Sequence, residues 1–324
     1  MNIRIFCCLV LLGFPAFFCT ASPAADKPDG TSALAVSSGG NISRPQEPAG
    51  IAIMRRAYPD VAFLASYDSA ADDWRISITV PGADGGEPRH GELYWCEGRM
   101  LPADRLADRD DYWSMMYRYA EEVPDPAEFT EEDIARIRMV SSPEHRQNGP
   151  SSPQFFYDLL YDCATREQVE EHITQVSFLG KRSNLHARIA GPLARVEEEI
   201  LAAAETDAEV RDFAETLASA DSYNWREISD SGNRSFHSMG IAIDVLPEGW
   251  GTKNIYWAWR RDIDPENWML LPLDRRWMPP ARVIEIFEDN GFLWGGKWTI
   301  WDNMHFEYRP EVVLYTRSGY AAGN

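Results

Sequence analysis

The chain has 324 residues and a formal net charge of −20 at pH 7, which comes from 51 acidic and 31 basic residues. An acidic surface repels phosphate groups, so nucleic acid and anionic lipid are excluded as expected partners. Beyond the first residues, no segment offers the run of about 20 apolar residues that a transmembrane helix needs. We therefore expect no transmembrane segment.

Residues 1–24 have the pattern of a signal peptide. Arg4 is their only charge, an apolar run extends from Ile5 to Cys19, and small residues follow it. This run is too short to span a membrane as a helix. We therefore expect export to the periplasm or the extracellular space. Lipid attachment at Cys19 is the less favoured alternative, because two phenylalanines precede this cysteine where small residues would be expected.

Residues 25–50 are rich in proline, glycine and serine, which predicts a flexible linker. The next region, 51–165, contains apolar runs at Val61–Ala65, Trp74–Val80 and Glu92–Cys96. These runs predict a small sheet with helical additions, a mixed α/β region whose role the sequence does not indicate. Its aromatic clusters are expected in the core, with a sugar-binding face as the alternative.

Cys96 and Cys163 are the two cysteines that lie clear of the signal region. An even number of cysteines in an exported protein is typical of a disulfide. We therefore predict a bridge between Cys96 and Cys163. Two buried free thiols are the alternative.

The C-terminal region, 166–324, begins with a helical pattern that extends from Arg166 to Ala220. Apolar residues recur at helical spacing in Val196–Ala204 and Ala208–Ala218. A further helix is predicted from Ala281 to Asn290, because prolines precede it and a glycine follows it. These helices are expected to pack against a catalytic sheet.

His237 and Asp244 flank a stretch in which large apolar and small side chains alternate. If residues 241–245 form a strand, the isoleucines and the valine face the core, and Asp244 lies on the opposite face with the small side chains. His237 then lies in the preceding turn, where Ser235 can satisfy backbone groups and Gly240 allows an unusual backbone conformation. The pattern predicts a metal-binding face.

His305 offers a second imidazole, and Asp302 lies three residues before it. Three protein ligands with one position left for water describe a catalytic zinc site, whereas a structural site is usually closed by a cysteine. No cysteine cluster exists in the sequence. A carboxylate at Asp302 can take a proton from the water at the zinc and pass it to the leaving amine.

Three stretches carry a family resemblance: NWREI at 224–228, SFHSMGIAID at 235–244 and GFLWGGKWTIWDNMHFEY at 291–308. They resemble the zinc D-Ala-D-Ala carboxypeptidases, dipeptidases and L-alanyl-D-glutamate endopeptidases that act on bacterial cell-wall peptides. The aspartate before the second histidine and the Trp-Gly-Gly-x-Trp run look most like the endopeptidase branch. The chain departs from the family after Asp244, where Val245-Leu246 replaces a frequent asparagine.

The resemblance implies an α+β fold, a small antiparallel sheet with flanking helices of the Hedgehog and DD-peptidase type, over residues 166–324. It implies zinc as the cofactor, with His237, Asp244 and His305 as ligands and Asp302 as the base. It also implies that Arg226 faces the scissile carbonyl or a substrate carboxylate. Ser235 and Trp298 complete the expected substrate contacts, although the tryptophans before Asp302 can equally be core residues.

The leading hypothesis is an exported zinc peptidase that cuts peptidoglycan stem peptides at the L-Ala-D-Glu bond. D,D-carboxypeptidase or dipeptidase activity on D-Ala-D-Ala would use the same residues. A non-catalytic cell-wall binding module is disfavoured because it has no chemical use for Asp302. Serine or cysteine catalysis is disfavoured because no Gly-x-Ser-x-Gly motif is present.

Overall fold

The computed structural model describes residues 45–228 and 233–319. The predicted signal peptide and most of the predicted linker lie outside these residues. Helix α1 (Ala49–Ala57) begins just before the predicted end of the linker at residue 50. Within the described part of the chain, no helix has the length and apolar character that crossing a membrane requires.

An antiparallel sheet opens the N-terminal region, in the order β1 (Ala62–Asp68), β2 (Asp73–Val80) and β3 (Arg89–Tyr94). All three predicted strands are confirmed, with shifted ends. Alternate residues of β2 are buried, which gives the sheet an apolar face. The α-helices α2 (Glu131–Val140), α3 (Pro143–Asn148) and α4 (Phe155–Tyr161) follow the sheet, and α5 (Arg166–Glu170) begins the C-terminal region.

The C-terminal region is built around a four-stranded antiparallel sheet, in the order β6-β7-β9-β8. Its strands are β6 (Leu217–Asp221), β7 (Ala242–Pro247), β8 (Phe292–Trp294) and β9 (His305–Tyr308). The helices around this sheet are α6 (Ala187–Ala204), α7 (Ala208–Glu215), α8 (Trp257–Ile263), α9 (Ala281–Asp289) and α10 (Pro310–Arg317). The expected α+β class is confirmed.

The sequence pattern predicted that residues 166–220 are helical throughout, and this prediction is wrong in part. A hairpin of β4 (Ile173–Phe178) and β5 (Lys181–His186) precedes α6. Gly180 lies in its turn at a φ of 76°, a conformation that glycine adopts without steric cost. The hairpin was missed because its strands are only partly buried, and their sequences lack a strict alternation of apolar and polar residues.

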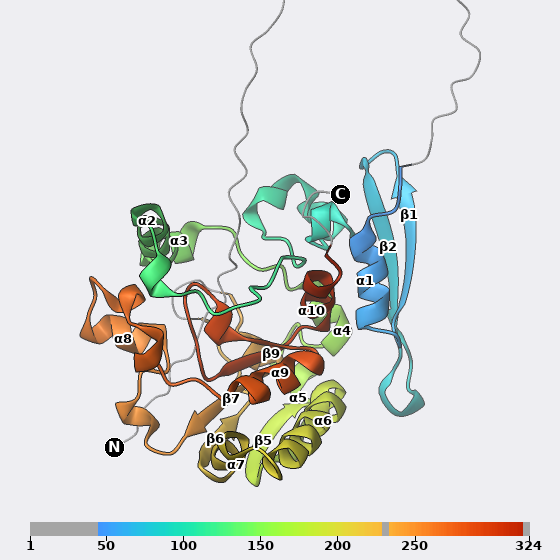
Figure 1. Ribbon diagram of the computed structural model, residues 1–324. Coiled ribbons are helices and arrows are strands. Elements are labelled where there is room, and N and C mark those ends of the chain that lie inside the picture. Colours follow the sequence, from blue (N-terminus) through green and yellow to red (C-terminus); the bar gives the residue numbers. More distant parts are fainter. Residues whose placement is uncertain (1–44, 229–232, 320–324) are drawn as a thin grey trace, which may run out of the picture.

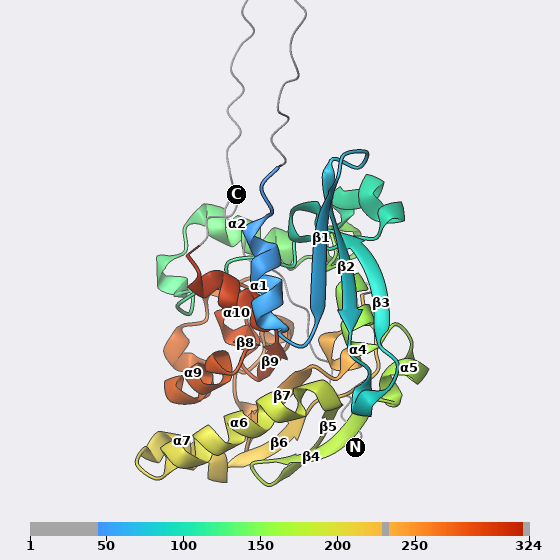
Figure 2. The same cartoon turned by 90° about the vertical axis from the view of Figure 1, so that its right-hand side faces the viewer.

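One hydrophobic core joins the two regions. It runs from Ile51 and Ile53 of α1 through β2 and α6 to Ile243 of β7. Figures 1 and 2 show α1 beside α10, and the two helices are in contact. The N-terminal region is therefore packed into the body of the molecule.

Both cysteines are buried free thiols, so the predicted disulfide is wrong. Cys96 follows β3, where its amide donates to Asp73. Cys163 follows α4, and its thiol lies 3.5 Å from both the carbonyl oxygen of Tyr157 and the carboxylate of Asp158. The pairing rested on the number of cysteines, and their number carries no information about where each side chain packs.

Candidate metal centre

Strand pairing brings two of the predicted ligands together. In the antiparallel ladder of β7 and β9, Asp244 lies directly opposite His305. Residues opposite each other in such a ladder place their side chains on the same face of the sheet. Both residues are buried, at 6% and 1% exposure. The sheet register therefore fixes the spacing of this carboxylate and this imidazole.

A short 3₁₀ turn, Phe236–Met239, supplies the third ligand. The hydroxyl of Ser235 accepts a hydrogen bond from the His237 amide and caps this turn. Gly240 ends it at a φ of 67°. A Cβ at Gly240 would come within 2.8 Å of the His186 nitrogen, so glycine is required here for space as well as for conformation. The turn directs the imidazole of His237 onto the strand pair.

The potential ligand atoms of His237, Asp244 and His305 lie within 4.8 Å of one another. His237 Nε2 lies 3.1 Å from both Asp244 Oδ1 and His305 Nδ1, and the latter two atoms are 2.8 Å apart. Ligands at ordinary zinc distances in a tetrahedral site are separated by about 3.3 Å. The donor types and their spacing therefore fit a zinc ion with three protein ligands.

The second nitrogen of each imidazole has a fixed partner. His237 Nδ1 donates to the carbonyl oxygen of Ser222 at 2.5 Å, and His305 Nε2 donates to Glu307 Oε1 at 3.0 Å. In the neutral imidazoles, these bonds leave Nε2 of His237 and Nδ1 of His305 with lone pairs for the metal. Such partners set the tautomer and the ring orientation of metal-binding histidines.

Charge at this site is balanced among the three side chains. Burial opposes ionisation of Asp244, but the neighbouring imidazoles hold the pKa of its carboxyl well below the usual value. Burial alone would lower the pKa of His305, yet hydrogen bonds to Asp244 and Glu307 raise it well above the usual value. An incoming metal ion must therefore displace a proton from His305.

Asp302 is fully buried and lies outside the three-ligand group found among the described residues. Its amide donates to Gly295, and its carbonyl oxygen accepts from the amide of His305. These backbone bonds fix Asp302 at the start of the turn that leads into β9. A base that is distinct from the ligands is compatible with this placement.

Arg226 and Ser235 lie next to each other beside the turn that holds His237, and the amide of Ser235 donates to the Arg226 carbonyl oxygen. The amide of Arg226 donates to Ser238 Oγ at 2.8 Å, and this hydroxyl in turn donates to the Arg226 carbonyl oxygen. The guanidinium Nε of Arg226 is buried and hydrogen-bonds to none of the described residues. The hydroxyl of Ser235 caps the turn by accepting from the His237 amide. Their substrate contacts stay predictions.

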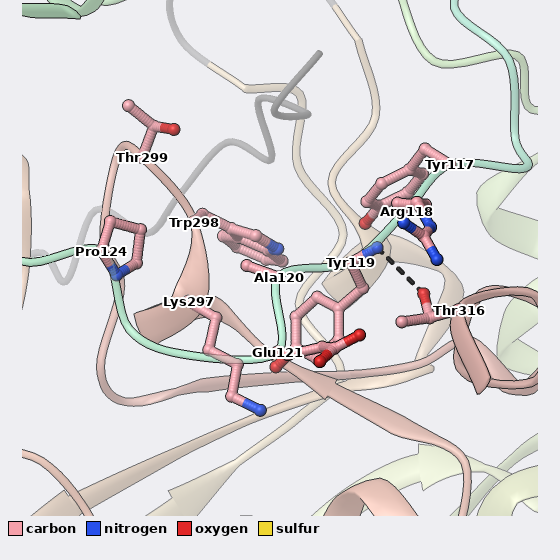
Figure 3. Close-up of a pocket in the computed structure, with 10 residues that line it drawn as sticks. All are labelled: Tyr117, Arg118, Tyr119, Ala120, Glu121, Pro124, Lys297, Trp298, Thr299 and Thr316. Atoms are coloured by element: carbon pink, nitrogen blue, oxygen red, sulfur yellow. Dashed lines mark hydrogen bonds between the residues drawn. The ribbon is translucent and has the colours of Figure 1, made fainter. Parts of the chain in front are cut away.

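Trp298 connects the metal centre to a surface cavity. Its ring lies against that of His305, with a centroid distance of 5.6 Å, and it is 4% exposed. The cavity has a volume of about 360 Å³ and is also lined by Lys297, Thr316 and residues 117–121 of the N-terminal region. Figure 3 shows Tyr119 and Ala120 of this segment beside Trp298. Trp298 is thus a largely buried residue that lines the cavity, and its predicted substrate contact stays a prediction.

The supporting residues around the ligands, such as Ser222 and Glu307, were not predicted from the sequence. From His305 onward, every second residue is ionisable: His305, Glu307, Arg309 and Glu311. A period of two in a strand places residues on one face. This repeat of ionisable residues was the sequence pattern that could have predicted the supporting residues.

Two family models match parts of the chain. Residues 229–308, which contain the three ligands and Asp302, match a family model described as D-alanyl-D-alanine carboxypeptidase. Residues 51–117 match a model described as a domain of unknown function. No curated protein and no solved structure matches the chain. The C-terminal part of the chain is therefore similar to the D-alanyl-D-alanine carboxypeptidase family, and this similarity supports a peptidase.

Proposed function

We propose that this protein is an exported zinc peptidase that hydrolyses peptidoglycan stem peptides, with cleavage of the L-Ala-D-Glu type. The observation that carries the proposal is the convergence of His237, Asp244 and His305, each buried and oriented for one ion. A fourth position without a protein ligand is what a hydrolytic zinc site requires.

The residues divide the chemistry among themselves. When bound, zinc supplies a Lewis acid that polarises the scissile carbonyl and lowers the pKa of water. The Asp302 carboxylate takes the proton of the attacking water and gives it to the nitrogen of the leaving amine. Arg226 places its guanidinium near the carbonyl oxygen and stabilises the negative charge that develops there. Burial of the site strengthens both interactions.

The cavity beside Trp298 supports an extended substrate. An endopeptidase must accept peptide on both sides of the scissile bond, whereas a carboxypeptidase needs room for only a terminal residue. The cavity adjoins the ring that packs on His305, and the exposed Arg118 offers a cation to substrate carboxylates at its rim. We assign one arm of the stem peptide to this cavity.

Removal of the terminal D-alanine is the second candidate. It is favoured by the description of the matching family model. The same ligands and the same base would serve this reaction, so the two candidates differ only in how the substrate lies across the zinc. Asp302 in place of glutamate and the Trp294–Trp298 run favour the endopeptidase.

Mass spectrometry of digested muropeptides tests the proposal. The zinc-loaded protein is incubated with muropeptides that carry pentapeptide stems, alongside a chelator-treated sample and one restored with zinc. We expect release of the peptide that begins at D-glutamate, with L-alanine retained on the sugar. Loss of only the terminal D-alanine would establish the carboxypeptidase instead. If no stem peptide is cut under any zinc-loaded condition, the peptidase proposal is wrong.

A further inference from the structure

A row of buried ionisable residues leads away from the metal centre. His305 and Glu307 lie on β9, and Arg309 and Glu311 follow where the chain enters α10. All four are at most 3% exposed. Burial of an unpaired ion costs several kcal/mol, so a row of this kind persists only if each charge is compensated.

The members of the row compensate one another in sequence. Glu307 Oε1 accepts from His305 Nε2, and Glu307 Oε2 lies 3.9 Å from Arg309 Nη1. Arg309 Nε donates to Glu311 Oε1. Negative, positive and negative charges therefore alternate from the metal ligand outward. The link from Arg309 to Glu307 is a charge contact without a hydrogen bond, because Glu307 Oε2 hydrogen-bonds to none of the described residues.

The outer end of the row is held by the N-terminal region. Tyr58, which follows α1, donates to Glu311 Oε2 at 2.6 Å, and Tyr157 of α4 donates to Glu311 Oε1 at 2.7 Å. Arg309 Nη2 donates to the carbonyl oxygen of Met115 at 3.2 Å. Figure 2 shows α1 beside α10, which brings Tyr58, the residue that follows α1, close to Glu311. Residues more than 150 positions apart in the chain, such as Tyr157 and Glu311, thus share one buried network.

We propose that the N-terminal region positions the metal ligand His305 through this row, with Tyr58 and Tyr157 as the positioning residues that it contributes. The two hydroxyls donate to the two carboxylate oxygens of Glu311 and fix its orientation, and Glu311 in turn orients Arg309. Arg309 in turn holds Glu307 against the imidazole, so that His305 Nδ1 faces the metal. This inference rests on the proposed zinc function. It assigns a role to the region in which the sequence indicated none.

The tyrosine hydroxyls, rather than the rings alone, carry the inference. Burial and the charge of Glu311 raise the pKa of Tyr58 well above its usual value, so its hydroxyl stays a proton donor. The ring of Tyr157 packs edge-on against Phe236, the first residue of the turn that holds His237. Replacement of tyrosine by phenylalanine keeps these ring contacts and removes only the hydrogen bonds, which separates positioning from packing.

Tyr119 provides a matched control. It also belongs to the N-terminal region, is buried, and donates to a glutamate of the C-terminal region, Glu288, at 2.7 Å. Glu288 pairs with Lys297 and does not belong to the row. Tyr119→Phe therefore removes the hydrogen bonds of a buried hydroxyl to Glu288 and to the backbone of Trp294, neither of which belongs to the row.

The test measures zinc affinity by competition with a chelator in the full chain. The variants are Tyr58→Phe, the double variant Tyr58→Phe/Tyr157→Phe, Glu307→Gln and Tyr119→Phe. Loss of a partner of a metal-binding histidine weakens binding by about 10- to 100-fold. We expect this loss for Glu307→Gln, about 10-fold for the double tyrosine variant, and wild-type affinity for Tyr119→Phe. The visible spectrum of the cobalt-loaded protein should change in Glu307→Gln and in the double tyrosine variant, and it should stay unchanged in Tyr119→Phe.

The outcomes separate this inference from the proposed function. If wild-type protein binds no zinc, the proposed function fails and the inference fails with it. If wild-type protein binds zinc and the double variant binds it as tightly as Tyr119→Phe does, only the inference is overturned. Should the double variant not fold, Tyr58→Phe decides in its place, with a smaller loss of affinity expected and wild-type affinity contradicting the inference.

Discussion

Two groups in the described part of the chain contain a pair of histidines and an aspartate, and only one of these two is arranged to bind a metal. In the first, the ligand atoms of His237, Asp244 and His305 converge. In the second, His172 Nε2 meets Asp162 at 3.1 Å, and the ring of His172 lies 5.4 Å from that of His186. Among the described residues, the second group is not found as a possible metal site.

The second group differs in how its lone pairs are used. His186 Nε2 donates to the Tyr161 carbonyl oxygen at 2.8 Å, and its Nδ1 accepts from the amide of Arg188 at the start of α6. Both nitrogens of His186 therefore serve the backbone. In the metal centre, each imidazole gives one nitrogen to a fixed partner and keeps the other for the ion. The orientation of the donors, rather than their identity, separates a ligand set from a structural cluster.

The largest effect is expected from the base beside the metal centre. Asp302→Asn is nearly isosteric and removes the proton acceptor, so cleavage of stem peptides should fall by roughly 10²- to 10⁴-fold while zinc is retained. Asp162→Asn, which changes the carboxylate of the second group, should leave cleavage unchanged. Initial rates and zinc content are measured for both variants. Near-wild-type cleavage by zinc-loaded Asp302→Asn would contradict the assignment, and loss of zinc would make Asp302 a ligand.

A smaller effect is expected on stability below neutral pH. Burial is the main cause that lowers the pKa of His186 from 6.5 to about 4. Between pH 6.5 and pH 4, His186 is therefore protonated in the unfolded chain and neutral in the folded chain. The free energy of unfolding decreases as the pH falls through this range. A shift of this size corresponds to about 3 kcal/mol between pH 7 and pH 4.

His186→Gln tests this pH dependence, because glutamine can donate to Tyr161 and accept from Arg188 without titrating. Urea unfolding at pH 7 and pH 4 should show that the variant loses less stability than the wild type, by about 3 kcal/mol. An equal loss in both proteins would show that His186 does not titrate as its surroundings indicate.

The smallest effect concerns the thiols. Burial raises the pKa of Cys163 well above its usual value, and Cys96 is also a free thiol. Alkylation of the unfolded, unreduced protein that lacks residues 1–24 should therefore modify both cysteines. Reductant should leave the melting temperature of the folded protein unchanged. If both cysteines resist alkylation until a reductant is added, the chain contains the disulfide that the sequence predicted.

Much of the metal centre could be predicted from local sequence. The alternation after Gly240 predicted strand β7, and the buried Asp244 lies on it as expected. The serines and the glycine around His237 indicated the capped turn. These features depend on neighbours in the chain, so a single sequence carries them.

The features that were missed depend on long-range packing. The hydrogen bond between Tyr58 and Glu311 joins residues 253 positions apart, and no local pattern indicates it. The free state of Cys96 and Cys163 likewise depends on where β3 and α4 end in the fold. Sequence patterns constrain elements and motifs, whereas partners across the core follow from the packing of many elements together.

Zinc content, measured by elemental analysis, tests the central claim most directly. The comparison uses the purified protein and two variants, His237→Ala from the metal centre and His172→Ala from the second group. We expect about one zinc per chain in the wild type and in His172→Ala, and almost none in His237→Ala. Full zinc occupancy in His237→Ala, or loss of zinc in His172→Ala with retention in His237→Ala, would contradict the account.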